Sequence, residues 1–171
     1  MHEFHTQRRR ALINQADALK ADRPSSLVAA YSLAAYQLAK RSPGISAQEQ
    51  LNLSVSAVDA LERADLLSLA VDILHEQPRL LARLDASDAD FLDQALKHAA
   101  IAMLAARYNE TLEAYAVALH YLTFVDHRQV APASLYLSRG QAAFEHGDYP
   151  LAVINSWIHR ITAASRRDCP A

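Results

Sequence analysis

The sequence is poor in the residues that form tight turns and in those that form covalent cross-links. Glycine occurs three times and cysteine once in 171 residues. The scarcity of glycine argues against a fold with many tight hairpins. The single cysteine, Cys169, cannot form an intramolecular disulfide, so we expect a protein of the reducing cytoplasm.

Long apolar runs and an excess of positive charge are also missing. No stretch approaches the length of a membrane span, and the short apolar segment at residues 11–13 is followed at once by Asn14, Gln15 and Asp17. The net charge is −2 and the pI is about 6.4, whereas nucleic-acid binders are usually basic. We therefore expect neither a membrane span nor a nucleic-acid partner.

One basic cluster, Arg8-Arg9-Arg10, stands against this overall acidity. Two interpretations are open: a solvated helix face, which the nearby Asp17 and Asp22 favour, or a contact with an anionic or acidic partner.

The sequence contains no recognisable catalytic or metal-binding motif. His2 and His5 are spaced to share a helix face, but no carboxylate or cysteine completes a metal shell beside them. The other six histidines form no Glu-x-x-His or His-x-x-x-His pair, and no Gly-x-Ser-x-Gly segment or glycine-rich phosphate loop is present. Cys169 follows Asp168, which would not lower its pKa. We expect no metal, no cofactor and no catalytic residue; an enzyme whose site leaves no short motif is the remaining alternative.

Apolar residues recur three and four positions apart between clusters of turn residues, a pattern that predicts an all-α protein. Pro43-Gly44, Pro78 and Gly147 are expected to end helices, and Pro150 is tolerated in a first turn. Capping residues are expected at Ser46 with Glu49, at Ser87 with Asp90, and at Asp148. A polar connector is expected over residues 126–132. The eight predicted helices cover about residues 6–21, 25–42, 46–63, 66–76, 87–106, 109–124, 133–146 and 149–167.

Two segments in the second half of the chain repeat one pattern of small and aromatic residues. In the later copy Gly140, Tyr149 and Ala152 lie around a Gly-Asp-Tyr turn, and Tyr136 precedes them. This copy resembles the centre of a tetratricopeptide repeat, a helix-turn-helix unit in which small residues let two helices approach and an aromatic residue marks the turn. The earlier copy has Ala99, Tyr108, Tyr115 and Ala118 at the matching places, with Thr111 where the family usually has alanine.

The two copies are 41 residues apart (149 − 108), longer than the family's usual 34. Weaker copies follow towards the N-terminus: first Ala57, Ala60, Leu67, Ala70 and Leu74, then Ala18, Leu27, Ala30 and Ala34. The resemblance implies one domain over 1–171, a short right-handed solenoid with its best repeats at 90–125 and 132–167 and degenerate pairs at 6–42 and 46–77. An irregular helical bundle is the alternative.

The resemblance also implies a site for a partner protein. In the family the first helix of each pair lines a groove, and these positions correspond here to Leu96, Ala100, Met103 and Leu104, then Leu137, Gln141, Phe144 and Glu145. Mostly apolar side chains suit a hydrophobic segment of a partner. The alternative, which we favour for Leu104 and Leu137, is that these side chains pack within the protein.

The expected function is therefore that of a non-enzymatic adaptor or dedicated chaperone. In size and repeat number the chain is similar to small bacterial chaperones that shield hydrophobic secretion substrates, a likeness of architecture alone. The alternative is a structural or regulatory subunit of a larger protein assembly.

The last helix suggests a second interface. A helical wheel places Leu151, Val153, Ile154, Trp157, Ile158 and Ile161 in one broad apolar arc, with Asn155, Ser156, His159 and Arg160 opposite. Terminal repeats usually have a polar outer face, so this arc is either filled by the chain's own helices or forms an interface with Val153 and Trp157 at its edge.

If the arc is an interface, the chain should form a homodimer. Light scattering should then give twice the monomer mass, and Trp157→Asp should return it to the monomer without loss of helical circular dichroism, because a charge replaces a buried ring. A parent protein that stays monomeric at high micromolar concentration would contradict this prediction.

Overall fold

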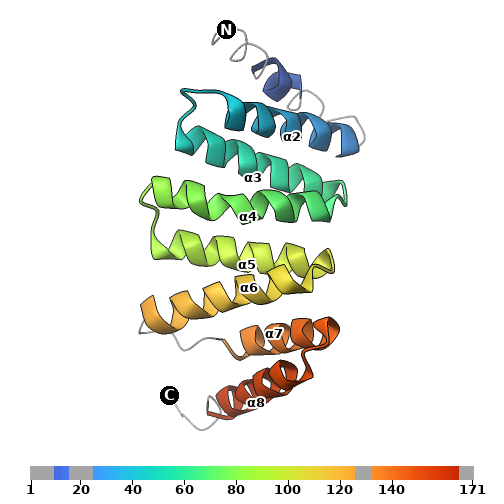
Figure 1. Cartoon of the computed structure of the whole chain (residues 1–171), viewed down its shortest axis with the longest axis vertical. Helices are drawn as coiled ribbons and strands as arrows, with labels where there is room; N and C mark the ends of the chain where they lie inside the picture. Colours follow the sequence, from blue (N-terminus) through green and yellow to red (C-terminus); the bar gives the residue numbers. More distant parts are fainter. Residues whose placement is uncertain (1–9, 16–24, 126–131, 166–171) are drawn as a thin grey trace. The chain divides into compact units, whose positions relative to one another are not determined.

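The structure, a computed structural model, describes residues 10–15, 25–125 and 132–165, and every regular element in these ranges is helical (Figure 1). The predicted all-α class is confirmed. Residues 10–15 are the described part of the first predicted helix; the Arg8-Arg9 pair, His2, His5, the 126–131 connector and Cys169 lie outside the described ranges. The helices with described bounds are α2 (Ser25–Arg41), α3 (Ala47–Arg63), α4 (Leu67–Arg83), α5 (Asp88–Leu104), α6 (Tyr108–His120), the π-helical turn η1 (Tyr121–Val125), α7 (Ala133–His146) and α8 (Tyr149–Ser165).

The chain divides into two compact units, Met1–Ala86 and Ser87–Ala171. In the first unit α3 packs against both α2 and α4; in the second, α5 packs on α6 and α7 on α8, with α6 also contacting α7. That both units form the single domain expected over 1–171 stays a prediction.

The predicted caps are present at three helix starts. The side chain of Ser46 accepts a hydrogen bond from the Glu49 N–H, and Asp148 Oδ1 accepts one from the Leu151 N–H, both at 3.1 Å. Ser87 and Asp90 form the full reciprocal pair: the Asp90 N–H donates to Ser87 Oγ, and the Ser87 N–H donates to Asp90 Oδ2 at 2.9 Å. These bonds satisfy backbone donors that a helix start leaves unpaired.

The predicted end of the fourth helix before Pro78 is wrong. α4 continues through Pro78 to Arg83. An internal proline costs about 3 kcal/mol because it removes one backbone hydrogen bond and crowds the preceding turn. Leu80 and Leu81, beyond the proline, are both buried, and burying a leucine side chain contributes about 1.5–3 kcal/mol. The two leucines therefore offset the defect.

The predicted sixth helix, 109–124, is present, but its last turn is not α-helical as expected. α6 ends at His120, and η1 widens the helix over the next five residues. Tyr121 in this turn stacks on Phe91 of α5, with ring centroids 5.7 Å apart and planes at 11°. The wider turn thus places an aromatic ring on the neighbouring helix.

The turns inside the helical hairpins repeat one geometry. Their central residues have positive φ angles, 58° at Asp65, 56° at Ala106 and 90° at Gly147, and lie 41 residues apart (106 − 65 and 147 − 106); Asp85, between α4 and α5, has the same left-handed form with φ 47°. The interval inferred from Tyr108 and Tyr149 therefore extends back into the first unit. In each turn a backbone N–H donates to the carbonyl five residues earlier, as is typical of helices ended by a left-handed residue. These pairs are Leu66 to Leu61, Arg107 to Ala102 and Asp148 to Ala143.

Small residues let the paired helices approach, as the resemblance implied. Gly140, Ala143 and Ala152 are buried between α7 and α8, and a Cβ atom added to Gly140 would lie 3.2 Å from Asn155 Cβ and 3.4 Å from the Ala152 carbonyl oxygen. In α2 the weak N-terminal copy is shifted by one residue: Ala29 is buried where Ala30 was expected, and it lies 41 residues before the buried Ala70.

A polar cluster links α2 to α4 in the first unit. The Tyr36 hydroxyl donates to Glu76 Oε2 at 2.6 Å, and the Lys40 ammonium pairs with Glu76 Oε1. Burial, together with the neighbouring carboxylate, raises the pKa of Tyr36, which stays protonated as the donor. Burial also acts to raise the pKa of Glu76, but the hydrogen bonds from Lys40 and Tyr36 outweigh it, so this pKa lies below its ordinary value of 4.5.

Gly140→Leu should destabilise the second unit by about 1–3 kcal/mol or more, because no side chain fits between α7 and α8 at this point. Gln141→Leu, at the exposed neighbouring position, is the matched control and should unfold like the parent. Urea titration followed by circular dichroism measures both. Equal midpoints for the two variants would contradict the close approach.

Glu76→Gln should lower the free energy of unfolding by about 1 kcal/mol at neutral pH, since it removes a partly exposed ion pair and a charged hydrogen bond. A carboxylate whose folded-state pKa is lowered stabilises the fold above its unfolded pKa, and this contribution is lost as the pH falls through the folded pKa. The difference between parent and variant should therefore shrink as the pH falls below 4.5. A difference that is the same at neutral and acid pH would contradict this role.

Candidate functional site

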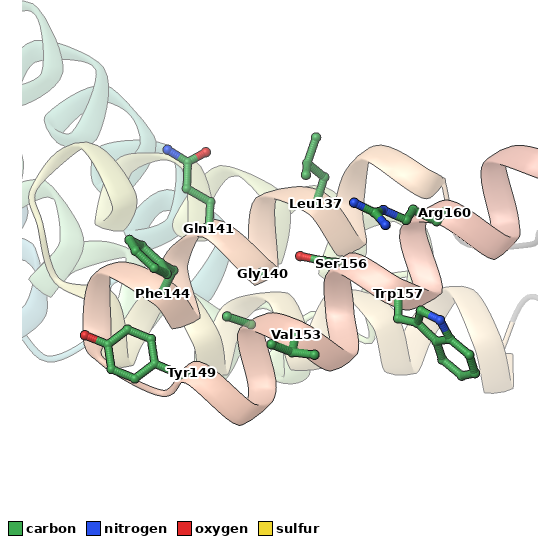
Figure 2. A pocket seen from close by; sticks show the side chains of 10 residues that line it. Leu137, Gly140, Gln141, Phe144, Tyr149, Val153, Ser156, Trp157 and Arg160 are labelled. Atoms are coloured by element: carbon green, nitrogen blue, oxygen red, sulfur yellow. The ribbon is translucent and has the colours of Figure 1, made fainter.

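Apolar side chains of α7 and α8 surround an open hollow of about 620 Å³ in the second unit (Figure 2). We call it the α7–α8 groove. α7 contributes one row of residues three and four apart, and α8 contributes another. The lining residues are Leu137, Gly140, Gln141, Phe144, Tyr149, Ala152, Val153, Ser156, Trp157 and Arg160.

The walls of the groove are large apolar residues that face solvent. The exposed fractions are 60% for Phe144, 59% for Tyr149, 68% for Val153 and 68% for Trp157. An aromatic side chain has roughly 150–250 Å² of surface to bury, so the three rings alone expose on the order of 300–450 Å². Large apolar side chains gathered in the open around one hollow are often a functional surface.

Local sequence sets the positions of these walls. Tyr149, Val153 and Trp157 are four residues apart, so they form one row along α8. The left-handed Gly147 reverses the chain between α7 and α8 and brings Phe144 against Tyr149. Their rings meet edge to face, with centroids 5.6 Å apart and planes at 67°. This aromatic pair closes one end of the groove.

The floor and the far end of the groove differ from its walls. Gly140 and Ala152 are buried at the bottom, and Ser156 lies beside Gly140. Arg160, near Trp157 in Figure 2, is the basic residue among the ten; no carboxylate, histidine or cysteine lines the groove. The site is thus an apolar trough with a small-residue floor and one cationic end. It offers binding surface but no acid-base or nucleophilic pair.

The two surfaces predicted from sequence are one surface. Leu137, Gln141 and Phe144 were expected in a partner groove, and Val153 and Trp157 on a dimer face; all five line the same hollow. A partner segment and a second copy of the chain would therefore compete for it.

The part of the predicted partner groove on α5 lies elsewhere. Leu96 is half-buried and lines a separate hollow of about 370 Å³ together with Tyr115, Leu122 and Leu135. Ala100 is exposed and Met103 half-buried, and neither lines either hollow. Of the six predicted groove residues, three therefore line the α7–α8 groove, Leu96 lines the other hollow, and Ala100 and Met103 line neither.

Two packing expectations are wrong. Leu104 is 69% exposed and Leu137 is 49% exposed, so neither packs inside the protein. The apolar arc of α8 is not filled by the described helices either, because Val153, Ile154, Trp157 and Ile161 are all exposed. The helical wheel also placed Asn155 on a polar side, yet Asn155 is buried, and its amide donates to the Leu151 carbonyl at 2.8 Å.

Sequence reasoning missed five groove residues: Gly140 and Ala152, which were interpreted only as contacts between helices, and Tyr149, Ser156 and Arg160. Tyr149 was interpreted only as the aromatic residue of the turn, although its spacing of four from Val153 and of eight from Trp157 indicates a shared row. Ser156 and Arg160 were assigned to the outer polar face of α8. No sequence pattern could have corrected this, since it depends on the position of α7.

The described residues contain neither a metal-binding cluster nor a membrane-spanning helix. No group of three or more histidine, cysteine, aspartate or glutamate side chains in these ranges could hold a metal ion. Nor is any helix within them long and apolar enough to cross a bilayer.

Comparison with known proteins adds no relative. No model of a protein family matches the chain, and no curated protein sequence matches it. The likeness to tetratricopeptide repeats therefore rests on the residues around the turns alone; the 41-residue interval indicates internal repetition but differs from the family's usual 34.

Proposed function

We propose that the protein is a non-enzymatic adaptor or dedicated chaperone that holds an apolar segment of a partner protein in the α7–α8 groove. The observation that supports this function is the exposure of Phe144, Tyr149, Val153 and Trp157 around one hollow. An aggregation-prone or secreted client in the cytoplasm is the class of partner that such a protein would shield. Its helix pairs would be repeats of the tetratricopeptide type.

Aromatic walls suit this role energetically. Trp and Tyr are enriched among the few residues that dominate binding energy at interfaces, particularly where they surround a pocket. When a partner covers these side chains, each Å² of apolar surface removed from water contributes about 25 cal/mol to the binding free energy.

A second copy of the chain would occupy the same residues. Self-association would then protect the groove in the absence of a client and would be reversed by client binding, because both use Val153 and Trp157.

A subunit of a fixed assembly is the alternative function. It draws on the same exposed surface, since obligate interfaces are also rich in apolar residues. The two functions differ in the identity and stoichiometry of what covers the groove.

The tagged parent should capture its partner from cells of the source organism, and Phe144→Glu with Trp157→Glu should reduce that capture at least about tenfold, as expected when two interface anchors are lost. Leu69→Glu with Val117→Glu is the matched control: both residues are apolar and exposed, at 43% and 46%, and lie outside the groove. Circular dichroism should show that both double variants remain helical.

Mass spectrometry of the captured material then separates the two functions. Secreted or aggregation-prone clients would support the adaptor or chaperone, and one stoichiometric complex would support the assembly subunit. Equal capture by the groove variant and its control would show that the groove does not bind the partner.

A further inference from the structure

By the repeat interval, the α7–α8 groove corresponds to a surface of the α5–α6 hairpin that α7 covers in part; Ala100 and Ala116, the equivalents of Gln141 and Trp157, are exposed. A step of 41 residues, the interval between the turns at Ala106 and Gly147, relates Leu96 to Leu137 and Tyr115 to Ser156. Leu96 and Tyr115 line the hollow of about 370 Å³ together with Leu135 of α7, and Leu135 is buried in one cluster with Ala99 and Tyr115. At the equivalent place in the preceding hairpin, therefore, the occupant is a helix.

The groove differs from the equivalent surface of the α5–α6 hairpin in the size of the residues that line it. Four positions have smaller residues: Gly140 in place of Ala99, Ala152 in place of Thr111, Val153 in place of Leu112, and Ser156 in place of Tyr115; at the edge, Trp157 stands in place of the smaller Ala116. The change from Tyr115 to Ser156 removes a whole aromatic ring from a position beside Gly140. The groove thus has room for a bulkier side chain than the surface beneath α7 accepts.

The groove also differs from the equivalent surface of the α5–α6 hairpin in charge. Arg160 stands where the preceding hairpin has Leu119, a partly buried residue packed on the core of the second unit. An occupant that places only apolar atoms over this position would strip water from a guanidinium without compensation. A carboxylate at this end would pair with it.

We infer that the groove binds an amphipathic α-helix of a partner protein. This helix lies over α7 and α8 as α7 lies over α5 and α6. It inserts one bulky apolar side chain over Gly140, Ala152 and Ser156 and directs a carboxylate to Arg160. The inference rests on the proposed function and names the form of its partner.

A helix fits better than an extended segment. From Tyr149 to Arg160 the α8 wall rises over 11 residue steps (160 − 149), about 16 Å, which corresponds to three turns of a second helix. An extended segment that bound by strand addition would need backbone donors and acceptors along the groove, as a sheet edge provides; a polyproline-type segment needs none and is the competitor displayed by the second library below. The walls are helices, whose backbone groups are already bonded within each helix.

A partner helix also fits better than a second copy of the chain. In a twofold contact the same ten residues meet each other, and none of them is acidic. Arg160 would then find no carboxylate. A helix from another protein can supply one.

Selection from two phage-displayed libraries tests the inference with the intact chain as target. One library displays a stable amphipathic helix with varied apolar residues at every third or fourth position and with Glu or Lys at one end. The other displays proline-containing extended peptides of equal length. We expect binders from the helical library, with Glu favoured over Lys.

Two variants then locate the binding. Ser156→Tyr fills the hollow with the residue of the preceding hairpin and should weaken the selected helices at least about tenfold, as loss of an anchor pocket does. Ala116→Tyr adds the same ring at an exposed α6 position outside the groove and should leave affinity unchanged. Arg160→Glu should reverse the preference to Lys.

Binders from the extended library alone, helices that bind the Ser156→Tyr variant as well as the parent, or a homodimer that no helix dissociates would each overturn the inference. These outcomes are distinct from failure of the proposed function. If partner capture depends on Phe144 and Trp157 but only extended peptides bind, the adaptor function stands and the helical partner does not. If helices bind the groove but capture does not depend on it, the helix-binding groove stands and the adaptor function fails.

Discussion

The close approach of neighbouring helices at small residues is the constraint on which the second unit depends. Gly140 has no space for a Cβ atom beyond a tight contact with Asn155, and buried alanines line the rest of the contact between α7 and α8. Only helices held this near can be joined by a turn as short as the one at Gly147. The same approach brings the rows of Phe144 and Trp157 to opposite sides of one hollow. The packing of α7 on α8 and the groove between their exposed rows therefore have the same cause, the small residues at the helix contact.

Much of this fold could be predicted because its determinants are local. Caps such as Ser87 and breaks such as Gly147 act through their own backbone neighbours, so their effects could be predicted from sequence. The end of α4 could not, because whether Pro78 stops the helix depends on the burial of Leu80 and Leu81 against other helices. Local rules set what a residue prefers, and tertiary packing decides whether that preference is overridden.

Only part of the groove could be predicted from the sequence, because its lining also depends on tertiary packing. Periodicity placed Val153 and Trp157 at the edge of the apolar side of α8, and the structure leaves both exposed. It also assigned Ser156 to the opposite side, although Ser156 lies beside Gly140. A helical wheel describes the faces of one helix, whereas the lining of a groove depends on the positions of two. Ser156 and Arg160, which the wheel misplaced, have roles that are set by the second helix.

The exposure of Trp157 has a practical consequence, because it is the single tryptophan of the chain. With 68% of its surface in contact with solvent, its indole ring reports the polarity of the groove and of no other part of the molecule. Covering the groove would move this ring from water into an apolar contact and shift its fluorescence emission to shorter wavelength. The protein thus contains its own optical reporter of groove occupancy, which needs neither a dye nor an added label.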